Sequence, residues 1–168
     1  MTYIIGIDPG PTQSGVVVYQ PNVYKVQYAD VVENENVHLR LTTLPLWTVA
    51  STEYAQIVLA IEFPCFYGKS VSIGRDVLET AAMVGWLEAE VMRGYSRKRV
   101  RITRRQVRMH LCGTMRSGDA QVWQALLDRY GGRSTAIGNK KNPGPLYGVK
   151  SHARAALAVA ITAAEMQQ

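Results

Sequence analysis

Two short, largely apolar runs, each followed at once by an acidic residue, stand out in the hydrophobic pattern of this chain. The first is Tyr3–Ile7, before Asp8, and the second is Ile57–Ile61, before Glu62. Both are rich in β-branched side chains, which is typical of strands buried in a sheet. A buried carboxylate is costly unless it faces an ion, a cation or water, so both acids are candidate metal ligands. Taken alone, Asp8 is equally well interpreted as a turn-forming residue before Pro and Gly.

The rest of the first half predicts two more strands and two helices. Val16–Tyr19 is a strand that returns after the first turn, and residues 24–32 form a third strand. Helical spacing over 34–44 predicts a short helix capped by Asn34. A longer apolar stripe predicts an amphipathic helix over 72–93.

The second half predicts one strand and three helices. Val100 and Ile102 alternate with arginines, which indicates a strand. Thr103 and Gln106 form a capping-box pattern, which predicts that a helix begins there. The remaining predicted segments are a helix over 120–130 opened or capped by Asp119, a Gly/Pro/Lys-rich mobile linker over 133–150, and a last helix over 151–166 capped by Ser151.

Length and composition indicate a single domain over residues 1–168. With 168 residues and 47% hydrophobic side chains, the chain can bury a sizeable core. No apolar run approaches the roughly 20 residues of a membrane span, and the chain begins with a strand rather than a signal peptide, so we expect no membrane partner. Cys65 and Cys112 lie far apart, which favours reduced thiols in a cytoplasmic protein over a disulfide or a zinc site.

Charge is divided sharply between the two halves of the chain. Residues 1–92 carry four basic and ten acidic side chains, a net charge of −6, whereas residues 93–168 carry fifteen and three, a net charge of +12. A one-sided field of this strength predicts a polyanionic partner, of which nucleic acid is the usual one. Eight cations lie between residues 93 and 108, and such a stripe suits phosphate contacts that position a duplex without reading its sequence.

The candidate DNA-binding residues are cations and two aromatic side chains. The cations are Lys69, Arg75, Arg97, Lys98, Arg101, Arg104, Arg105, Arg108, Lys140, Lys141 and Lys150. Phe66 and Tyr67, beside Lys69, are candidates for stacking on unpaired bases. An equally good interpretation is that these aromatic residues cover the helix that follows.

Four motifs occur in a fixed order over nearly the whole chain. They are Gly6-Ile-Asp8-Pro-Gly10 with Gly15 downstream, Ala60-Ile-Glu62, Arg105-Gln-Val107, and His152-Ala-Arg-Ala155-Ala-Leu-Ala-Val-Ala-Ile161. On these residues the chain resembles the RuvC-like Holliday-junction resolvases of the RNase H-like superfamily, in a phage-type branch. The resemblance implies an α/β fold of the RNase H-like kind, with a central mixed five-stranded sheet flanked by helices.

The resemblance also implies an activity. RuvC-like resolvases are metal-dependent, structure-selective endonucleases that use two Mg²⁺ or Mn²⁺ ions per active site, about 3.5–4 Å apart. Carried over by motif position, Asp8 would lie between the metals, Glu62 would hold one of them, and His152 would match the third ligand. The implied partners are branched DNA, such as a four-way junction, and a second copy of the chain, because a junction needs two symmetric nicks. The predicted helix over 72–93 is a candidate for part of the dimer surface. If phage-encoded, the protein would act in the host cytoplasm.

Ala155 departs from the family pattern, which expects a fourth acidic ligand at this position. Three explanations stay open: a chain inactivated by an Asp→Ala change, a natural branch without this acid, or a carboxylate supplied by Asp119 instead. The competing interpretation of Asp119 is a helix N-cap. The competing interpretation of His152 is a residue in the first turn of the last helix that bonds to phosphate or solvent. Two carboxylates and one neutral histidine would neutralise two divalent ions poorly.

Two other functions fit parts of the sequence. A DNA-junction-binding protein with a degenerate nuclease centre fits the basic half equally well and is favoured by Ala155. A sugar-kinase-like or actin-like ATPase shares the pattern Asp8-x-Gly10-x-Thr12, which cups phosphate and Mg²⁺. Such ATPases need a second similar lobe, and this sequence contains no internal repeat.

Overall fold

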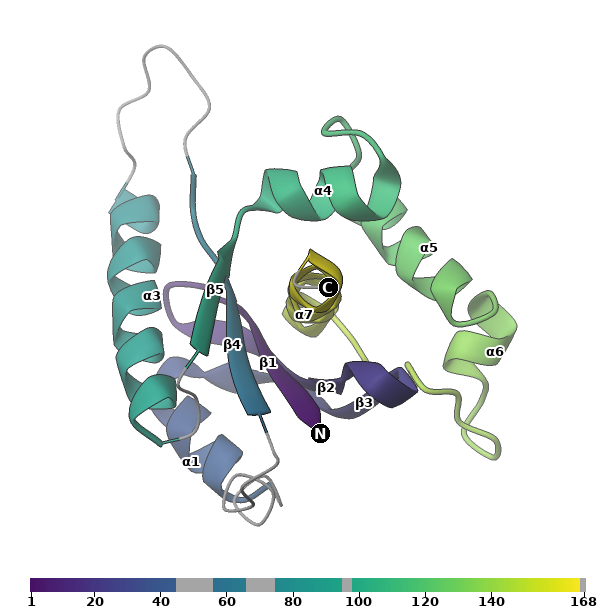
Figure 1. Cartoon of the computed structure of the whole chain (residues 1–168), viewed down its shortest axis with the longest axis horizontal. Coiled ribbons are helices and arrows are strands. Elements are labelled where there is room, and N and C mark those ends of the chain that lie inside the picture. The colour runs from purple at the N-terminus through teal and green to yellow at the C-terminus, as the bar shows by residue number, and fades with distance from the viewer. Residues whose placement is uncertain (45–55, 66–74, 95–97, 167–168) are drawn as a thin grey trace.

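A mixed five-stranded sheet forms the middle layer of the protein (Figure 1). A computed structural model describes residues 1–44, 56–65, 75–94 and 98–166. The strands are β1 (Thr2–Asp8), β2 (Gln13–Gln20), β3 (Lys25–Glu33), β4 (Gln56–Glu62) and β5 (Lys98–Ile102). Their order is β3-β2-β1-β4-β5; β2 is antiparallel to both β1 and β3, whereas β4 is parallel to both β1 and β5. The predicted sheet is confirmed.

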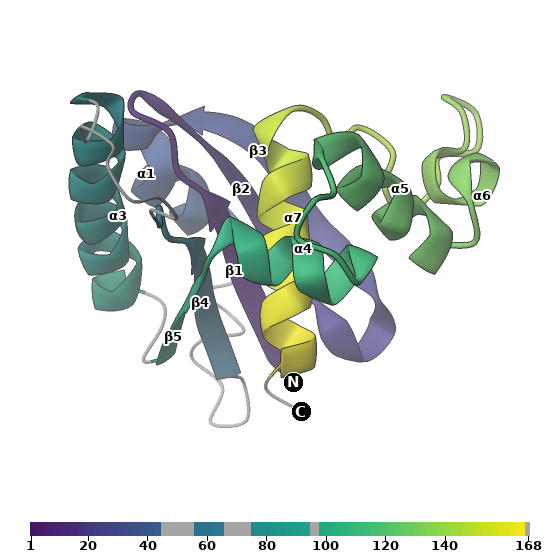
Figure 2. The ribbon, with the colours of Figure 1, turned by 90° about the horizontal axis from the view of Figure 1, so that it is seen from above.

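Helices cover both faces of this sheet (Figure 2). They are α1 (Val37–Thr42), α3 (Arg75–Gly94), α4 (Arg104–Cys112), α5 (Asp119–Arg129), α6 (Arg133–Ile137) and α7 (His152–Met166), with short 3-10 turns at Pro21–Val23 and Asn34–Asn36. One core lies between the sheet and α1 and α3, and a second lies between the sheet and α7, α4 and α5. Among the described residues, no helix combines the length and apolarity needed to cross a membrane.

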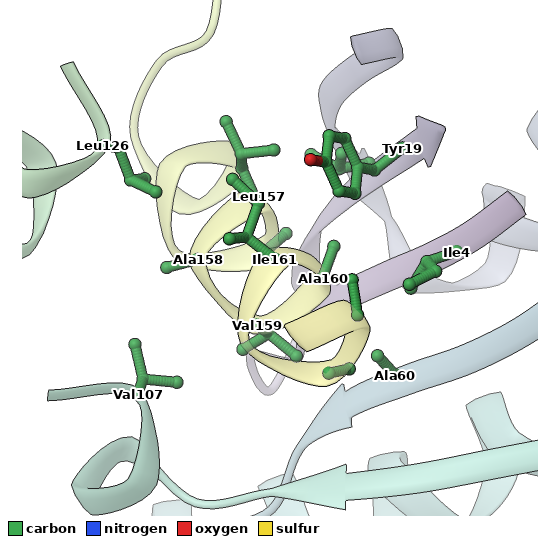
Figure 3. Packing of buried hydrophobic residues seen from close by; sticks show 14 of the residues in the cluster. Ile4, Tyr19, Ala60, Val107, Leu126, Leu157, Ala158, Val159, Ala160 and Ile161 are labelled. Atoms are coloured by element: carbon green, nitrogen blue, oxygen red, sulfur yellow. The ribbon is translucent and has the colours of Figure 1, made fainter. Parts of the chain in front are cut away.

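Helix α7 is surrounded by other elements, and the core around it contains many small and branched side chains (Figure 3). Ala160 lies toward Ile4 and Ala60 of the sheet, whereas Ala158 lies toward Leu126 of α5. Nearly every position from the second residue of α7 to its last turn is buried. This explains why the sequence of α7 is apolar around its whole circumference, as expected for a central helix.

Two glycines let α7 approach the sheet closely. A Cβ atom on Gly6 of β1 would lie 2.4 Å from the carbonyl oxygen of Ala156, and one on Gly15 of β2 would lie 2.2 Å from that of His152. Both distances are far below ordinary contact, so glycine is required for steric reasons. Because Gly15 is paired with Asp8, its contact places the first residue of α7 beside the end of β1.

Asn34 has a different role from the predicted helix cap. Neither the 3-10 turn that it begins nor α1 has a side-chain cap. Instead, the buried Asn34 side chain accepts a hydrogen bond from Ser14 Oγ at 2.6 Å and donates one to the carbonyl oxygen of Gly10 at 3.0 Å. The prediction was wrong because the Asn34 side chain forms its hydrogen bonds with groups of the turn between β1 and β2 rather than with the N–H groups of a helix end. These bonds hold in place the turn that follows Asp8.

The second half of the chain is more ordered than the pattern indicated. The predicted linker over 133–150 contains α6 and buries Leu146 and Val149, so the linker prediction was wrong. These two apolar side chains are separated by turn residues and form no periodic pattern, but both are buried in the core beside α7. The capping box of Thr103 is confirmed. Asp119 is the first residue of α5 rather than its N-cap, which is Gly118.

Candidate functional site

Asp8 and Glu62 lie side by side at the ends of the two central parallel strands. The register pairs Ile7 with Ile61, so the next residue of each strand brings the two acids together. Asp8 is 5% exposed. Both acids line one cavity of about 780 Å³. The sequence predicted both acids at strand ends, and the parallel pairing of β1 with β4 is what makes them neighbours.

His152 reaches Asp8 from the start of α7. Its Nδ1 lies 2.8 Å from Asp8 Oδ2, although the two residues are 144 positions apart in the chain. An ionised carboxylate only accepts hydrogen bonds, so this contact places the proton of a neutral ring on Nδ1 and leaves Nε2 as an acceptor. The three predicted metal ligands therefore all line one cavity, and His152 is bonded directly to Asp8.

Burial and mutual repulsion act on the two carboxylates. Burial raises the pKa of Asp8, against the lowering effect of the hydrogen bond from His152. Burial, followed by the negative charge of Asp8, raises the pKa of Glu62 to about 7, against the lowering effect of Arg104. Two neighbouring acids that are costly to ionise together form a site where a cation is stabilised.

Arginines surround the carboxylate pair. Arg104 Nε donates to Glu62 Oε1 at 3.1 Å, and Arg108 Nη2 lies 3.5 Å from Asp119 Oδ1. Asp119 lines the same cavity, and its side chain is 77% exposed. Glu62 and Asp119 are thus each paired with an arginine of α4, the helix that begins at the capping box.

Sequence reasoning missed two arginines of this cavity, Arg133 and Arg154. The guanidinium of Arg154 stacks over the Trp123 ring at 4.4 Å from its centroid, and Arg154 Nε donates to the carbonyl oxygen of Val149 at 3.3 Å. These contacts hold the guanidinium in place and leave other N–H groups for an anion. Arg154 was visible inside the His152 motif, but its neighbour Trp123 comes from α5, so local spacing did not reveal the stack.

The donor set fits one divalent ion more readily than two. Within the described part of the chain, no three His, Cys, Asp or Glu side chains gather as a metal site. Two adjacent carboxylates are nonetheless suitable for Mg²⁺, which binds one or two carboxylates together with water and substrate phosphate oxygens. Ala155 also lines the cavity and offers no ligand. Metal binding by Asp8, Glu62 and His152, and the number of ions bound, stay predictions.

Several predicted DNA-binding cations lie away from the cavity. Arg101 of β5 donates to both oxygens of Glu88 at 2.7 Å, and its guanidinium lies 4.7 Å from the centroid of the Phe63 ring. Glu88 belongs to α3, is buried, and also accepts from a second arginine of β5, so two arginines share one carboxylate on the α3 face of the sheet. Arg75 of α3 is paired with Glu79.

The other predicted DNA contacts divide into three groups. Exposed positions outside the cavity lining are Lys98, Arg105, Lys140, Lys141 and Lys150. Phe66, Tyr67, Lys69 and Arg97 lie outside the described residues. Arg104 and Arg108 are the predicted contacts that line the cavity. DNA binding by each of these residues stays a prediction.

The mixed sheet with a central helix across it defines the RNase H-like class of fold. No known family model matches the sequence, and no curated protein does. Among solved structures, Thermus thermophilus RuvC in complex with a Holliday junction substrate matches with 19% sequence identity and a TM-score of 0.63, over 98% of this chain and 93% of that chain. A second structure of Thermus thermophilus RuvC matches with 20% identity and a TM-score of 0.60, over 98% and 96%. The chain therefore has a RuvC-like fold.

Proposed function

We propose that this chain is a metal-dependent endonuclease that binds branched DNA, such as a four-way junction, and hydrolyses phosphodiester bonds beside Asp8 and Glu62. One observation carries the proposal: two adjacent acids, one of them almost fully buried, share a cavity with four arginines. Acids that attract a cation and arginines that attract phosphate suit the same substrate, a phosphodiester. The RuvC structure with a Holliday junction supports branched DNA as that substrate.

Each side chain has a distinct role in this proposal. Asp8 and Glu62 hold a divalent ion, Mg²⁺ or Mn²⁺, which when bound polarises a phosphoryl oxygen and lowers the pKa of a water. His152 orients the Asp8 carboxylate through Nδ1 and keeps Nε2 available to accept a proton. Arg108 and Arg154 bind the DNA phosphates that flank the reacting one.

A two-fold dimer is part of the proposal, because paired nicks in a junction require two equivalent sites. The outer side of α3 is the proposed dimer surface. It carries two exposed apolar side chains, Leu78 at 57% and Trp86 at 40% exposure. A phage-type origin and a cytoplasmic location stay predictions.

A second function is favoured by position 155. With Ala155 in the cavity and Arg104 bonded to Glu62, the chain would bind a junction through its arginines without cutting it. In this alternative the carboxylate pair is a remnant of a nuclease centre. Both functions predict junction binding, so only cleavage separates them.

The deciding experiment is nicking of an end-labelled four-way junction with Mg²⁺ or Mn²⁺. The chain itself, Asp8→Asn and Ala155→Asp run side by side, with Asp30→Asn, at an exposed position of β3, as a matched control. We expect symmetric nicks from the chain and from Asp30→Asn, and none from Asp8→Asn, which still binds the junction. Nicks from Ala155→Asp alone would identify a disabled nuclease. Binding without cleavage by every variant would establish the junction-binding alternative.

A further inference from the structure

Each of the two central carboxylates has one oxygen engaged by a neighbouring side chain. Glu62 Oε1 accepts from Arg104 Nε at 3.1 Å, and Asp8 Oδ2 lies 2.8 Å from His152 Nδ1. Within the described residues, the other oxygens, Oε2 of Glu62 and Oδ1 of Asp8, have no such bond. One oxygen from each acid, completed by water and phosphate oxygens, meets the needs of a single hard divalent ion.

The position of Arg104 is built into the backbone. Ile102, at the end of β5, is paired with Glu62, and its carbonyl oxygen accepts from the Phe63 N–H at 2.9 Å. Thr103 then caps α4 through a reciprocal capping box, so Arg104 is the first residue of that helix. Only Thr103 therefore separates Arg104 from the strand residue paired with Glu62, and the contact of Arg104 with this acid follows from the fold.

The charge around the carboxylate pair disfavours a second ion. The described lining of the cavity contains three carboxylates and four arginines, and Ala155 contributes no charge. The formal charges of these seven side chains sum to +1. A second divalent ion would lie near a guanidinium in a partly buried site, where like charges repel more strongly than in water.

We infer that this centre binds one divalent ion per chain and that the guanidinium of Arg104 supplies the positive charge that a second ion would otherwise supply. The inference rests on the proposed function, in which Asp8 and Glu62 hold a divalent ion. Arginine has five N–H donors, and in the described structure Arg104 uses one of them on Glu62. The others are available to a phosphate oxygen, where a charge-assisted hydrogen bond stabilises developing negative charge.

The test is the number of Mn²⁺ ions bound by the metal-free protein without DNA, measured from the electron paramagnetic resonance signal of free Mn²⁺. We expect one ion for the chain, for Arg104→Lys, which keeps the charge, and for Arg116→Ala, an exposed control. Arg104→Ala is expected to bind one ion about tenfold more tightly, because a competing charge is removed. Ala155→Asp alone is expected to bind one ion, and the double variant with Arg104→Ala is expected to bind two.

The outcomes separate this inference from the proposed function. Two ions in the unchanged chain, two in Ala155→Asp alone, or one in the double variant would each overturn the role of Arg104, while nicking of the junction could still hold. No bound ion in the unchanged chain would overturn both the inference and the metal-dependent mechanism. Circular dichroism of each variant tests whether a variant that binds fewer ions is still folded.

Discussion

Replacing Gly15 by alanine would damage the centre without removing a polar group. The new Cβ would lie 2.2 Å from the carbonyl oxygen and 2.3 Å from the carbonyl carbon of His152. Ordinary contact begins near 3.4 Å, so the start of α7 has to move by about 1.2 Å. Because His152 moves with this backbone, we expect its 2.8 Å contact with Asp8 to open.

The loss of stability in Gly15→Ala depends on which atoms the new Cβ overlaps. Overpacking a dense interior costs about 1–3 kcal/mol, and the cost is high where the neighbour cannot rotate away. Here the neighbour is the backbone of α7, so we expect a loss of about 3 kcal/mol in the free energy of unfolding. For a domain of this size, about 2–4 °C per kcal/mol converts this loss into a fall in Tm of about 6–12 °C.

Thermal and urea unfolding of Gly15→Ala measure this loss, and Gly85→Ala is the matched control. Gly85 lies inside α3 with no atom within 4 Å of an added Cβ, so alanine there is expected to raise the free energy of unfolding by about 0.5–1 kcal/mol through helix propensity. A Gly15→Ala protein that unfolds within about 1 °C of the parent, with an unchanged NMR signal for the His152 ring, would refute the close approach of α7 to β2.

Three further predictions address stability and binding. Glu88→Gln is expected to cost about 1–3 kcal/mol at pH 7, because two arginines of β5 lose a buried partner. Hydrogen bonds from Arg101 lower the pKa of Glu88 below its usual 4.5, so this stabilisation is full above that value and is lost as pH falls through the lower folded value; urea unfolding from pH 7 to pH 3 measures it. Arg154→Ala is expected to reduce the salt dependence of junction binding by about one counterion, unlike Arg116→Ala; an unchanged slope would exclude a phosphate contact. Asn34→Ala leaves the buried Ser14 hydroxyl without its acceptor and is expected to cost about 1–3 kcal/mol in urea unfolding, with Asn22→Ala, at an exposed turn, as the neutral comparison.

The sequence by itself determined the central strands, the acids that end them and the helix that crosses them. Alternating or continuous apolar runs and capping residues are local signals, so β1, β4, α4 and α7 follow from short stretches of chain. The resemblance carried by four motifs agreed with the observed sheet and with the fold of solved RuvC structures. The concentration of positive charge after residue 92 was equally plain from composition.

Tertiary structure decided which of these charges meet. Arg104 and Glu62 are 42 positions apart, Asp8 and His152 are 144 apart, and Arg101 is paired with an acid of α3. Such contacts depend on strand order, register and the close approach that Gly15 permits, none of which leaves a periodic signal in the sequence. Local pattern therefore identified the acids, and packing between distant elements selected the arginines and histidine that surround them.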